Sequence, residues 1–352
     1  MADNRLTIDE IERWLRQDDP ARLEDLWRQA DAVRRQFVGD AVHLRGLIEI
    51  SNHCVRGCRY CGINAANDSL VRYRMTADEI LACAHRAVDF DYGTVVLQAG
   101  EDPGIETEWL ADIVRRIKRR TPLAVTLSLG ERPVEDLICW RKSGADRYLL
   151  RFETSDARLY GMIHPSSPGH PDRMELLGVL RRLGYEVGSG VMVGIPGQRL
   201  HSLAEDINLF ARLDLDMIGI GPFIPNLHTP LGSGELAPPI DPAEQVPNTD
   251  LMTCKAVALT RRVCPQANIP STTALATINP ESGRELGLTR GANIIMPNLT
   301  PLQYRTLYEI YPGKACINET ADACNACLRT RIESIGRTIG SGPGGRKRIS
   351  NG

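Results

Sequence analysis

The feature that most constrains the fold is a regular alternation of strand-like and helix-like segments from Gly46 onward. Helical segments with apolar residues at helical spacing separate the strands, and two of them open with the capping boxes Thr76–Glu79 and Ser202–Glu205. Eight strands are predicted, at 46–51, 94–98, 124–128, 147–151, 186–192, 216–221, 268–272 and 293–296. Eight such units in about 260 residues predict an α/β fold, a complete (β/α)8 barrel of the TIM type. An open doubly wound sheet is the alternative, but no dinucleotide fingerprint follows the first strand.

The rest of the chain divides around this barrel. Residues 1–45 carry apolar residues at helical spacing and predict an N-terminal helical cover. Residues 46–312 form the predicted barrel, and 313–352 a C-terminal extension that carries cysteines. The formal charge of −2 argues against nucleic-acid binding through bulk electrostatics. No apolar run is long enough to span a membrane, and the charged N-terminus is unlike a signal peptide, so we expect a cytoplasmic protein with its ten cysteines reduced.

Three cysteines follow the first predicted strand with the spacing C-x3-C-x2-C. We call Cys54, Cys58 and Cys61 the first cysteine triad. Three thiolates on one loop cannot saturate a metal that prefers four ligands, but they suit an iron–sulfur cluster with one open iron. A zinc site with His53 as the fourth ligand is an alternative, and a disulfide with a spare thiol is a weaker one.

Polar residues gather just past the predicted strand ends, where a barrel places its reactive groups. Residues two apart on an extended chain share a face, so Arg151 and Glu153 point the same way, as do Thr126 and Ser128. An Arg–Glu pair at a barrel mouth either closes the barrel top as an ion pair or binds a zwitterionic ligand, and the neighbouring cysteine loop favours the ligand. His164 has no metal-ligand spacing and is interpreted as a surface histidine.

A second cysteine triad, with the spacing C-x7-C-x2-C, lies near the C-terminus. Its members are Cys316, Cys324 and Cys327. Clustered cysteines again indicate an iron–sulfur site, although zinc is an open alternative because C-x2-C is also a zinc half-site.

The first triad, with Tyr60 directly before its last cysteine, resembles the C-x3-C-x-aromatic-C signature of the radical S-adenosylmethionine (SAM) superfamily. From about residue 41 to the end the chain resembles more closely the HydE family of [FeFe]-hydrogenase maturases. Phe152 stands where that family often has histidine. The motifs that carry the resemblance are Leu-Gln-Ala-Gly-Glu-Asp-Pro at 97–103, Ser-Leu-Gly-Glu at 128–131, Asp-Arg-Tyr-Leu-Leu-Arg at 146–151, Gly-Ile-Gly-Pro-Phe-Ile-Pro at 219–225, Met-Pro-Asn at 296–298, Tyr-Pro-Gly-Lys at 311–314 and Gly-Gly-Arg-Lys-Arg at 344–348.

The resemblance implies a radical SAM enzyme whose first triad binds a [4Fe-4S] cluster and cleaves SAM reductively to a 5′-deoxyadenosyl radical. It implies that Glu101 and its neighbours face the SAM amino group, while Arg173 and Glu153 hold its carboxylate and ribose side. The implied cofactor-binding residues are Tyr60, Gln98, Gly100, Glu101, Ser128, Glu153 and Arg173. The implied substrate-binding residues are Thr126, Arg151, Thr272, Thr273, Met296, Tyr308 and Tyr311.

The resemblance further implies the substrate and partners. The substrate is a cysteine-bound iron carbonyl–cyanide complex made by HydG, on the route to the bridging dithiomethylamine ligand of the hydrogenase cofactor. The product passes towards HydF, and a low-potential donor supplies the electron. The second triad matches the variable site where some family members carry a second [2Fe-2S] or [4Fe-4S] cluster. Three other interpretations remain: a methylornithine synthase, a biotin synthase, and a zinc-stabilised barrel that binds a partner protein.

Overall fold

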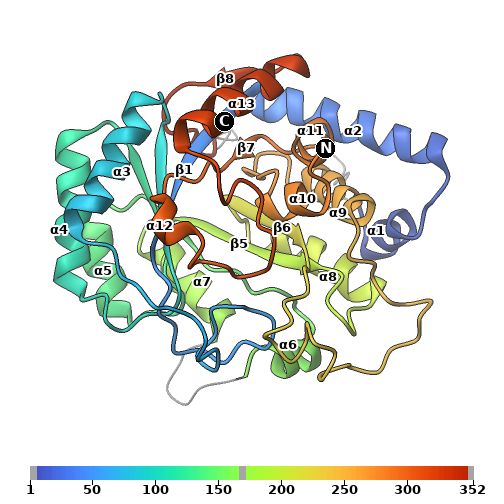
Figure 1. Ribbon diagram of the computed structural model, residues 1–352. Coiled ribbons are helices and arrows are strands. Elements are labelled where there is room, and N and C mark those ends of the chain that lie inside the picture. The colour runs from blue at the N-terminus through green and yellow to red at the C-terminus, as the bar shows by residue number, and fades with distance from the viewer. Residues whose placement is uncertain (1–5, 166–171, 348–352) are drawn as a thin grey trace.

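The computed structural model describes residues 6–165 and 172–347. Its centre is a curved parallel sheet in the order β6-β5-β4-β3-β2-β1-β7 (Figure 1). All of these neighbouring pairs are parallel, which requires a crossover between consecutive strands. The strands are β1 Ala41–Ser51, β2 Thr94–Ala99, β3 Ala124–Ser128, β4 Arg147–Leu149, β5 Glu186–Val193, β6 Met217–Pro222 and β7 Ile294–Ile295.

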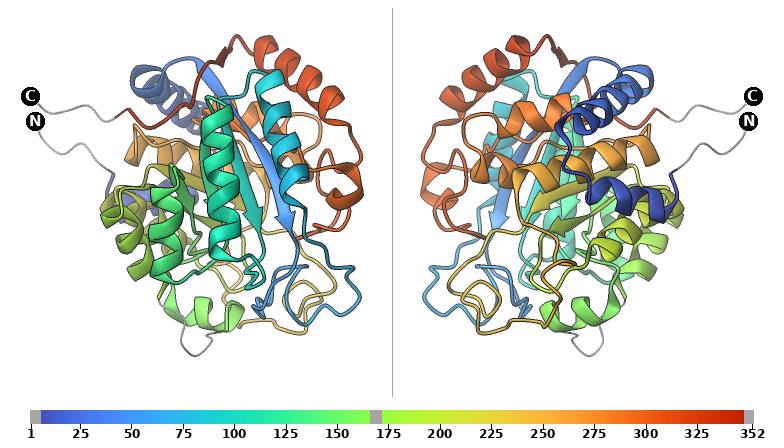
Figure 2. Two further views of the ribbon diagram at one scale, coloured as in Figure 1. Left: turned by 90° about the vertical axis from the view of Figure 1, so that its left-hand side faces the viewer. Right: turned by 90° about the vertical axis from the view of Figure 1, so that its right-hand side faces the viewer.

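Helices form a layer outside this sheet, as the two side views in Figure 2 show. Each predicted crossover from the first to the sixth strand contains a helix. The helices that follow strands are α3 Ala77–Asp89, α4 Thr107–Arg120, α5 Val134–Lys142, α6 Ala157–Ile163, α7 Arg173–Arg182, α8 Leu200–Arg212, α9 Asp250–Val263, α10 Thr273–Ile278, α11 Gly283–Thr289, α12 Leu302–Arg305 and α13 Ala321–Ser334. The inner faces of most of these helices and the strands form one apolar core, while Leu159 and Ile163 of α6 belong to a smaller second cluster.

One predicted capping box forms and the other does not. Thr76 and Glu79 exchange both capping contacts at the start of α3, so that prediction is confirmed. The box at Ser202 is wrong because α8 begins at Leu200, two residues earlier. The Ser202 hydroxyl contacts the Asp156 carboxylate instead, at 3.4 Å.

The predicted seventh strand at 268–272 is not a strand in the structure. Single parallel bridges join Asn268 to Met217 of β6 and Pro270 to Ile294 of β7. Proline at 270 has no N–H to donate to a ladder, which limits regular pairing at this position. The described sheet is therefore a seven-strand parallel path, and residues 268–270 lie between its two end strands.

The N-terminal helices lie outside the helical layer. They are α1 Ile8–Leu15 and α2 Pro20–Val38, which pack against α8 and α9 respectively. Lys255 of α9 is buried and donates to the Leu15 carbonyl at 3.0 Å, which fixes the end of α1. Strand β1 begins at Ala41 rather than at the predicted Gly46, so only two residues separate it from the end of α2 at Val38. Residues 1–5, the beginning of the predicted cover, lie outside the described residues.

The C-terminal segment returns to the beginning of the sheet. Strand β8 (Thr338–Gly340) pairs with β1, and the Gly344 carbonyl then accepts from Arg45 at 3.0 Å and Asn268 at 3.1 Å. Arg346 keeps only 14% of its side chain exposed and pairs with Asp214 at 2.7 Å. Residues 342–346 therefore cover the N-terminal ends of the strands, opposite the cysteine loop. Residues 348–352 lie outside the described part, and within the described part no helix has the length and apolarity needed to cross a membrane.

Candidate functional site

The first cysteine triad lies on a loop that leaves β1 and is held from several sides. The Val55 N–H donates to the Glu101 carbonyl at 3.0 Å, and the Glu101 N–H points back to the Cys54 sulfur at 3.4 Å. Arg72 donates to four backbone carbonyls within 52–67, at 2.7–3.2 Å. A side chain on Gly100 would meet the His53 carbonyl oxygen at 2.2 Å, so only glycine lets the end of β2 approach this loop.

The sequence-predicted site residues line a single cavity of about 340 Å³ at the carboxyl ends of the strands. This holds for the first triad and for every residue of the two predicted sets. They come from the cysteine loop, from β2, β3 and the residues after β2 and β4, from the start of α7, and from the segments after β6 and β7. Tyr308 and Gln98 are linked across it, the Gln98 amide donating to the Tyr308 hydroxyl at 3.2 Å. The predictions of position therefore agree with the structure, while the roles of these residues stay predictions.

Arg151 and Glu153 lie at the mouth of β4 in an unusual backbone conformation. Glu153 has φ of 64°, a left-handed value that a non-glycine residue adopts only when its surroundings enforce it. Its carboxylate lies 3.2 Å from Arg151 Nη2, so the expected ion pair is present. Arg151 Nε and Thr126 Oγ1 are buried without a hydrogen-bond partner, and both residues line the cavity. A buried polar group without a hydrogen-bond partner lowers the stability of the fold, so these two atoms favour a polar ligand in the cavity.

A buried charged group lies behind the cysteine loop, and sequence reasoning missed part of it. Glu131 accepts from Arg173 Nε at 2.7 Å, and Arg56 lies 3.7 Å from Glu131 and 3.8 Å from Glu101. Burial alone would raise the pKa of Glu131, but His164 and Arg173 lower it to about 2. Burial raises the pKa of Glu101. The sequence signal for Arg56 was its position between Cys54 and Cys58, where a charged residue lies between two predicted cluster ligands.

His164 is not the surface residue that the sequence suggested. Only 2% of it is exposed, and its Nδ1 lies 3.1 Å from the Cys58 sulfur. Burial lowers the pKa of His164 to about 4, so the ring is neutral near pH 7. The prediction was wrong because no spacing rule links positions 58 and 164. The short helix α6, unpredicted, carries the ring to the loop.

The chemistry of the first triad fits an iron–sulfur cluster better than a single ion. Zinc holds its sulfur ligands about 3.8 Å apart. Among the described residues, only Cys316, Glu319 and Cys324 bring three candidate ligand atoms within 4.8 Å of one another, so at least two sulfurs of the first triad lie farther apart than that. Burial raises the pKa of Cys58 to about 12, so its thiolate needs cationic partners such as iron.

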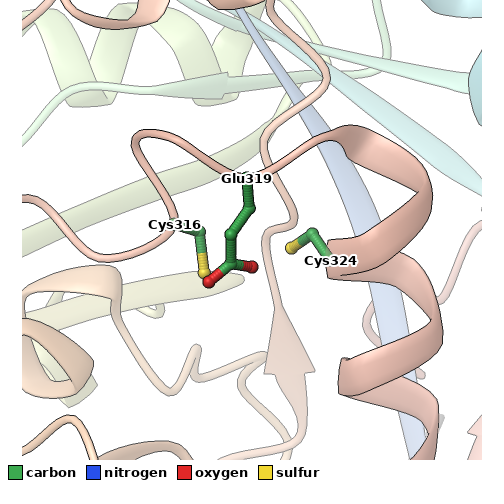
Figure 3. Close-up of side chains that lie close together, drawn as sticks. All are labelled: Cys316, Glu319 and Cys324. Atoms are coloured by element: carbon green, nitrogen blue, oxygen red, sulfur yellow. The ribbon is translucent and has the colours of Figure 1, made fainter.

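The second triad is only partly assembled. Cys316 and Cys324 face each other together with Glu319, as Figure 3 shows. Cys327 lies one helical turn beyond Cys324 on α13 and is exposed. Cys316 also lies 3.5 Å from Arg284 Nη2. The structure thus adds a carboxylate to the predicted set and leaves Cys327 outside the closest group.

Comparison with known proteins identifies the family. The Radical SAM superfamily model matches residues 48–210. The [FeFe] hydrogenase maturase subunit HydE of Thermotoga maritima is 47% identical over 93% of this chain and 90% of its own length. The chain belongs to the HydE family. It is therefore a radical SAM enzyme, and this family's chemistry implies the [4Fe-4S] cluster and SAM.

Two further comparisons give lower identities to this HydE-family chain. The 3-methylornithine synthase of Methanosarcina acetivorans is 26% identical over 83% of the chain and 79% of its own length. The crystal structure of methylornithine synthase superposes with a TM-score of 0.79 at 23% identity, covering 96% of this chain and 94% of that one. This likeness shows a shared fold.

Proposed function

We propose that this HydE-family enzyme acts in [FeFe]-hydrogenase maturation, on a cysteine-bound iron carbonyl–cyanide complex made by HydG. The observation that carries the proposal is the 47% identity over 93% of the chain to a curated HydE. The cavity supports it, since Arg151, with a buried and unpaired Nε, and the threonines at 126, 272 and 273 line it. That set fits the α-carboxylate of an amino-acid-derived ligand with a compact polar remainder.

In this proposal the first triad binds a [4Fe-4S] cluster that, when reduced, supplies the electron that cleaves SAM to methionine and a 5′-deoxyadenosyl radical. The chain's own residues bind and orient the reactants. Glu101, Glu153 and Arg173 line the same cavity as the first triad and hold SAM together with Tyr60, Gln98, Gly100 and Ser128. The curved sheet, with single bridges from residues 268 and 270 to its end strands β6 and β7, supports the proposal that the barrel shields the radical from water.

The substrate-side residues line the same cavity. Arg151 binds the substrate carboxylate with its fork, and the hydroxyls of Thr126, Thr272 and Thr273 bind its small polar groups. Met296, Tyr308 and Tyr311 complete the walls. The product passes towards HydF, and a low-potential donor in the reducing cytoplasm supplies the electron.

We also propose that the second triad binds a second, peripheral metal centre, an iron–sulfur cluster of two or four irons. Cys316 and Cys324 face each other, which supports a shared metal, and Glu319 supplies a further ligand atom. A zinc ion is the other outcome. Iron, zinc and acid-labile sulfide in the anaerobically purified protein distinguish the two, and an iron-free protein would exclude both clusters.

An anaerobic assay with SAM and a reductant tests the main proposal. The expected result is an adenosylated product from the iron complex, seen by mass spectrometry, and no turnover of lysine or dethiobiotin. Conversion of lysine to methylornithine would move the enzyme to the methylornithine synthases. Biotin synthase activity is not expected, because the cavity-lining cysteines among the described residues are those of the first triad, which leaves none for a sacrificial cluster.

A further inference from the structure

The buried ring of His164 lies between the cysteine loop and two tyrosines. It caps the C-terminal end of α6, stacks on Tyr160 with ring centroids 5.0 Å apart, and lies 6.4 Å from the ring of Tyr60. One ring nitrogen, Nδ1, lies 3.1 Å from the Cys58 sulfur. The other, Nε2, lies 3.0 Å from Arg56 Nη2. The ring is thus placed and oriented from both sides.

The partners determine which nitrogen carries the proton. Arg56 can only donate, so the contact at 3.0 Å requires Nε2 to be the unprotonated acceptor. The Glu131 carboxylate lies farther from Nε2, at 3.6 Å against 3.0 Å for Arg56, and accepts from Arg173 at 2.7 Å. A neutral imidazole with Nε2 unprotonated carries its hydrogen on Nδ1.

The Nδ1 hydrogen then points at the cluster ligand. The Tyr60 hydroxyl is the more distant neighbour of Nδ1, at 3.5 Å, against 3.1 Å for the Cys58 sulfur. A ligating cysteine is a thiolate and cannot donate, so this contact is favourable only as N–H···S, from the imidazole to the sulfur.

We propose that His164 is a positioning residue that donates an N–H···S hydrogen bond to the Cys58 thiolate and so raises the reduction potential of the cluster. Reduction adds negative charge to the cluster and its sulfurs, so a donor at a ligand sulfur stabilises the reduced form more than the oxidised form. The proposal rests on cluster binding by the first triad and is independent of the identity of the substrate.

Two amide substitutions separate hydrogen bonding from packing. Asparagine places its amide near the position of Nδ1 and can keep the donor to Cys58, whereas glutamine places its amide near Nε2 and keeps only the contact with Arg56. The measurement is an anaerobic redox titration without SAM, followed by electron paramagnetic resonance. His201, half-exposed and paired with Glu12 at 2.8 Å, provides the control variant His201→Gln.

At a fixed potential near the wild-type midpoint, we expect His164→Gln to lower the ratio of reduced to oxidised cluster about tenfold, which is ~59 mV for one electron. His164→Asn and His201→Gln should stay within about twofold of the wild-type ratio. Equal midpoints in the wild type and His164→Gln would overturn the proposal, as would equal shifts in the glutamine and asparagine variants.

A measurement on the wild-type protein keeps the test independent of variant folding. Protein labelled with 15N-histidine should show a weak 15N coupling to the reduced cluster in pulsed electron paramagnetic resonance. In labelled His164→Asn protein the donor is an unlabelled asparagine amide, so the coupling should come from 14N instead. Absence of any such coupling in a protein with full iron and sulfide would overturn the proposal. A protein without iron would instead contradict cluster binding itself, and failure with every substrate would contradict only the proposed function.

Discussion

Replacement of Arg151 by lysine tests the substrate side of the cavity. Arg151 Nη2 contacts the Val191 carbonyl and lies 3.2 Å from the Glu153 carboxylate, while its Nε is buried and free for a ligand. Lysine keeps the charge but cannot form two parallel hydrogen bonds to a carboxylate. One lost hydrogen bond to a charged group is worth about 1.5–3 kcal/mol, which predicts a fall in kcat/KM of roughly 10- to 150-fold.

The same substitution should leave uncoupled SAM cleavage within about threefold of the wild type. Arg173 donates to the Arg151 carbonyl at 2.6 Å, a backbone contact that the substitution retains. The assay measures adenosylated product and 5′-deoxyadenosine in parallel under anaerobic conditions. Arg141→Lys is the control, since Arg141 lies on α5 and donates to the Gly184 carbonyl at 3.1 Å, away from the cavity.

Two results would refute this reasoning. If SAM cleavage falls together with product formation, Arg151 belongs to the cofactor site. If neither falls, Arg151 does not bind the substrate carboxylate.

Three further predictions concern the cysteines and one buried acid. Replacing all three residues of the first triad with alanine should abolish SAM cleavage and remove the cluster, and wild-type rates of 5′-deoxyadenosine formation would contradict the assignment. Replacing the second triad with alanine should remove part of the metal, measured by elemental analysis, and leave SAM cleavage intact; loss of cleavage in a folded variant would place this site near the chemistry. Burial raises the pKa of Asp206 from 3.8 to about 7, so its contribution to stability is present at low pH and is lost as pH rises through this range. Asparagine has no charge to bury, so the unfolding free energy of Asp206→Asn relative to the wild type should rise by up to about 4 kcal/mol between pH 4 and pH 8, measured by denaturant unfolding. Parallel pH profiles for the two proteins would contradict this.

Local sequence patterns predicted the parts of the fold that depend on local physics. Alternation of strand-like and helix-like segments identified β1 to β6 and their crossovers, because side-chain periodicity reflects which face of each element is buried. The pattern failed at 268–272, where Pro270 allows single bridges but no ladder. The pattern also gives no information on residues 342–346, which cover the strand ends through backbone carbonyls that have no sequence signature.

For the site, the sequence by itself determined the first cysteine triad and the polar residues at the strand ends. The short spacing of the cysteines identifies the ligands, and the rule that parallel barrels place reactive groups at the carboxyl ends of their strands identifies the polar residues. In the structure, all of these residues line one cavity. Only the tertiary structure decided that His164 contacts Cys58 across 106 positions of sequence, that Glu153 has a left-handed backbone, and that Glu319 joins Cys316 and Cys324. The physical reason is that these contacts join side chains from different elements, and their geometry is set by how helices and loops pack rather than by any local spacing.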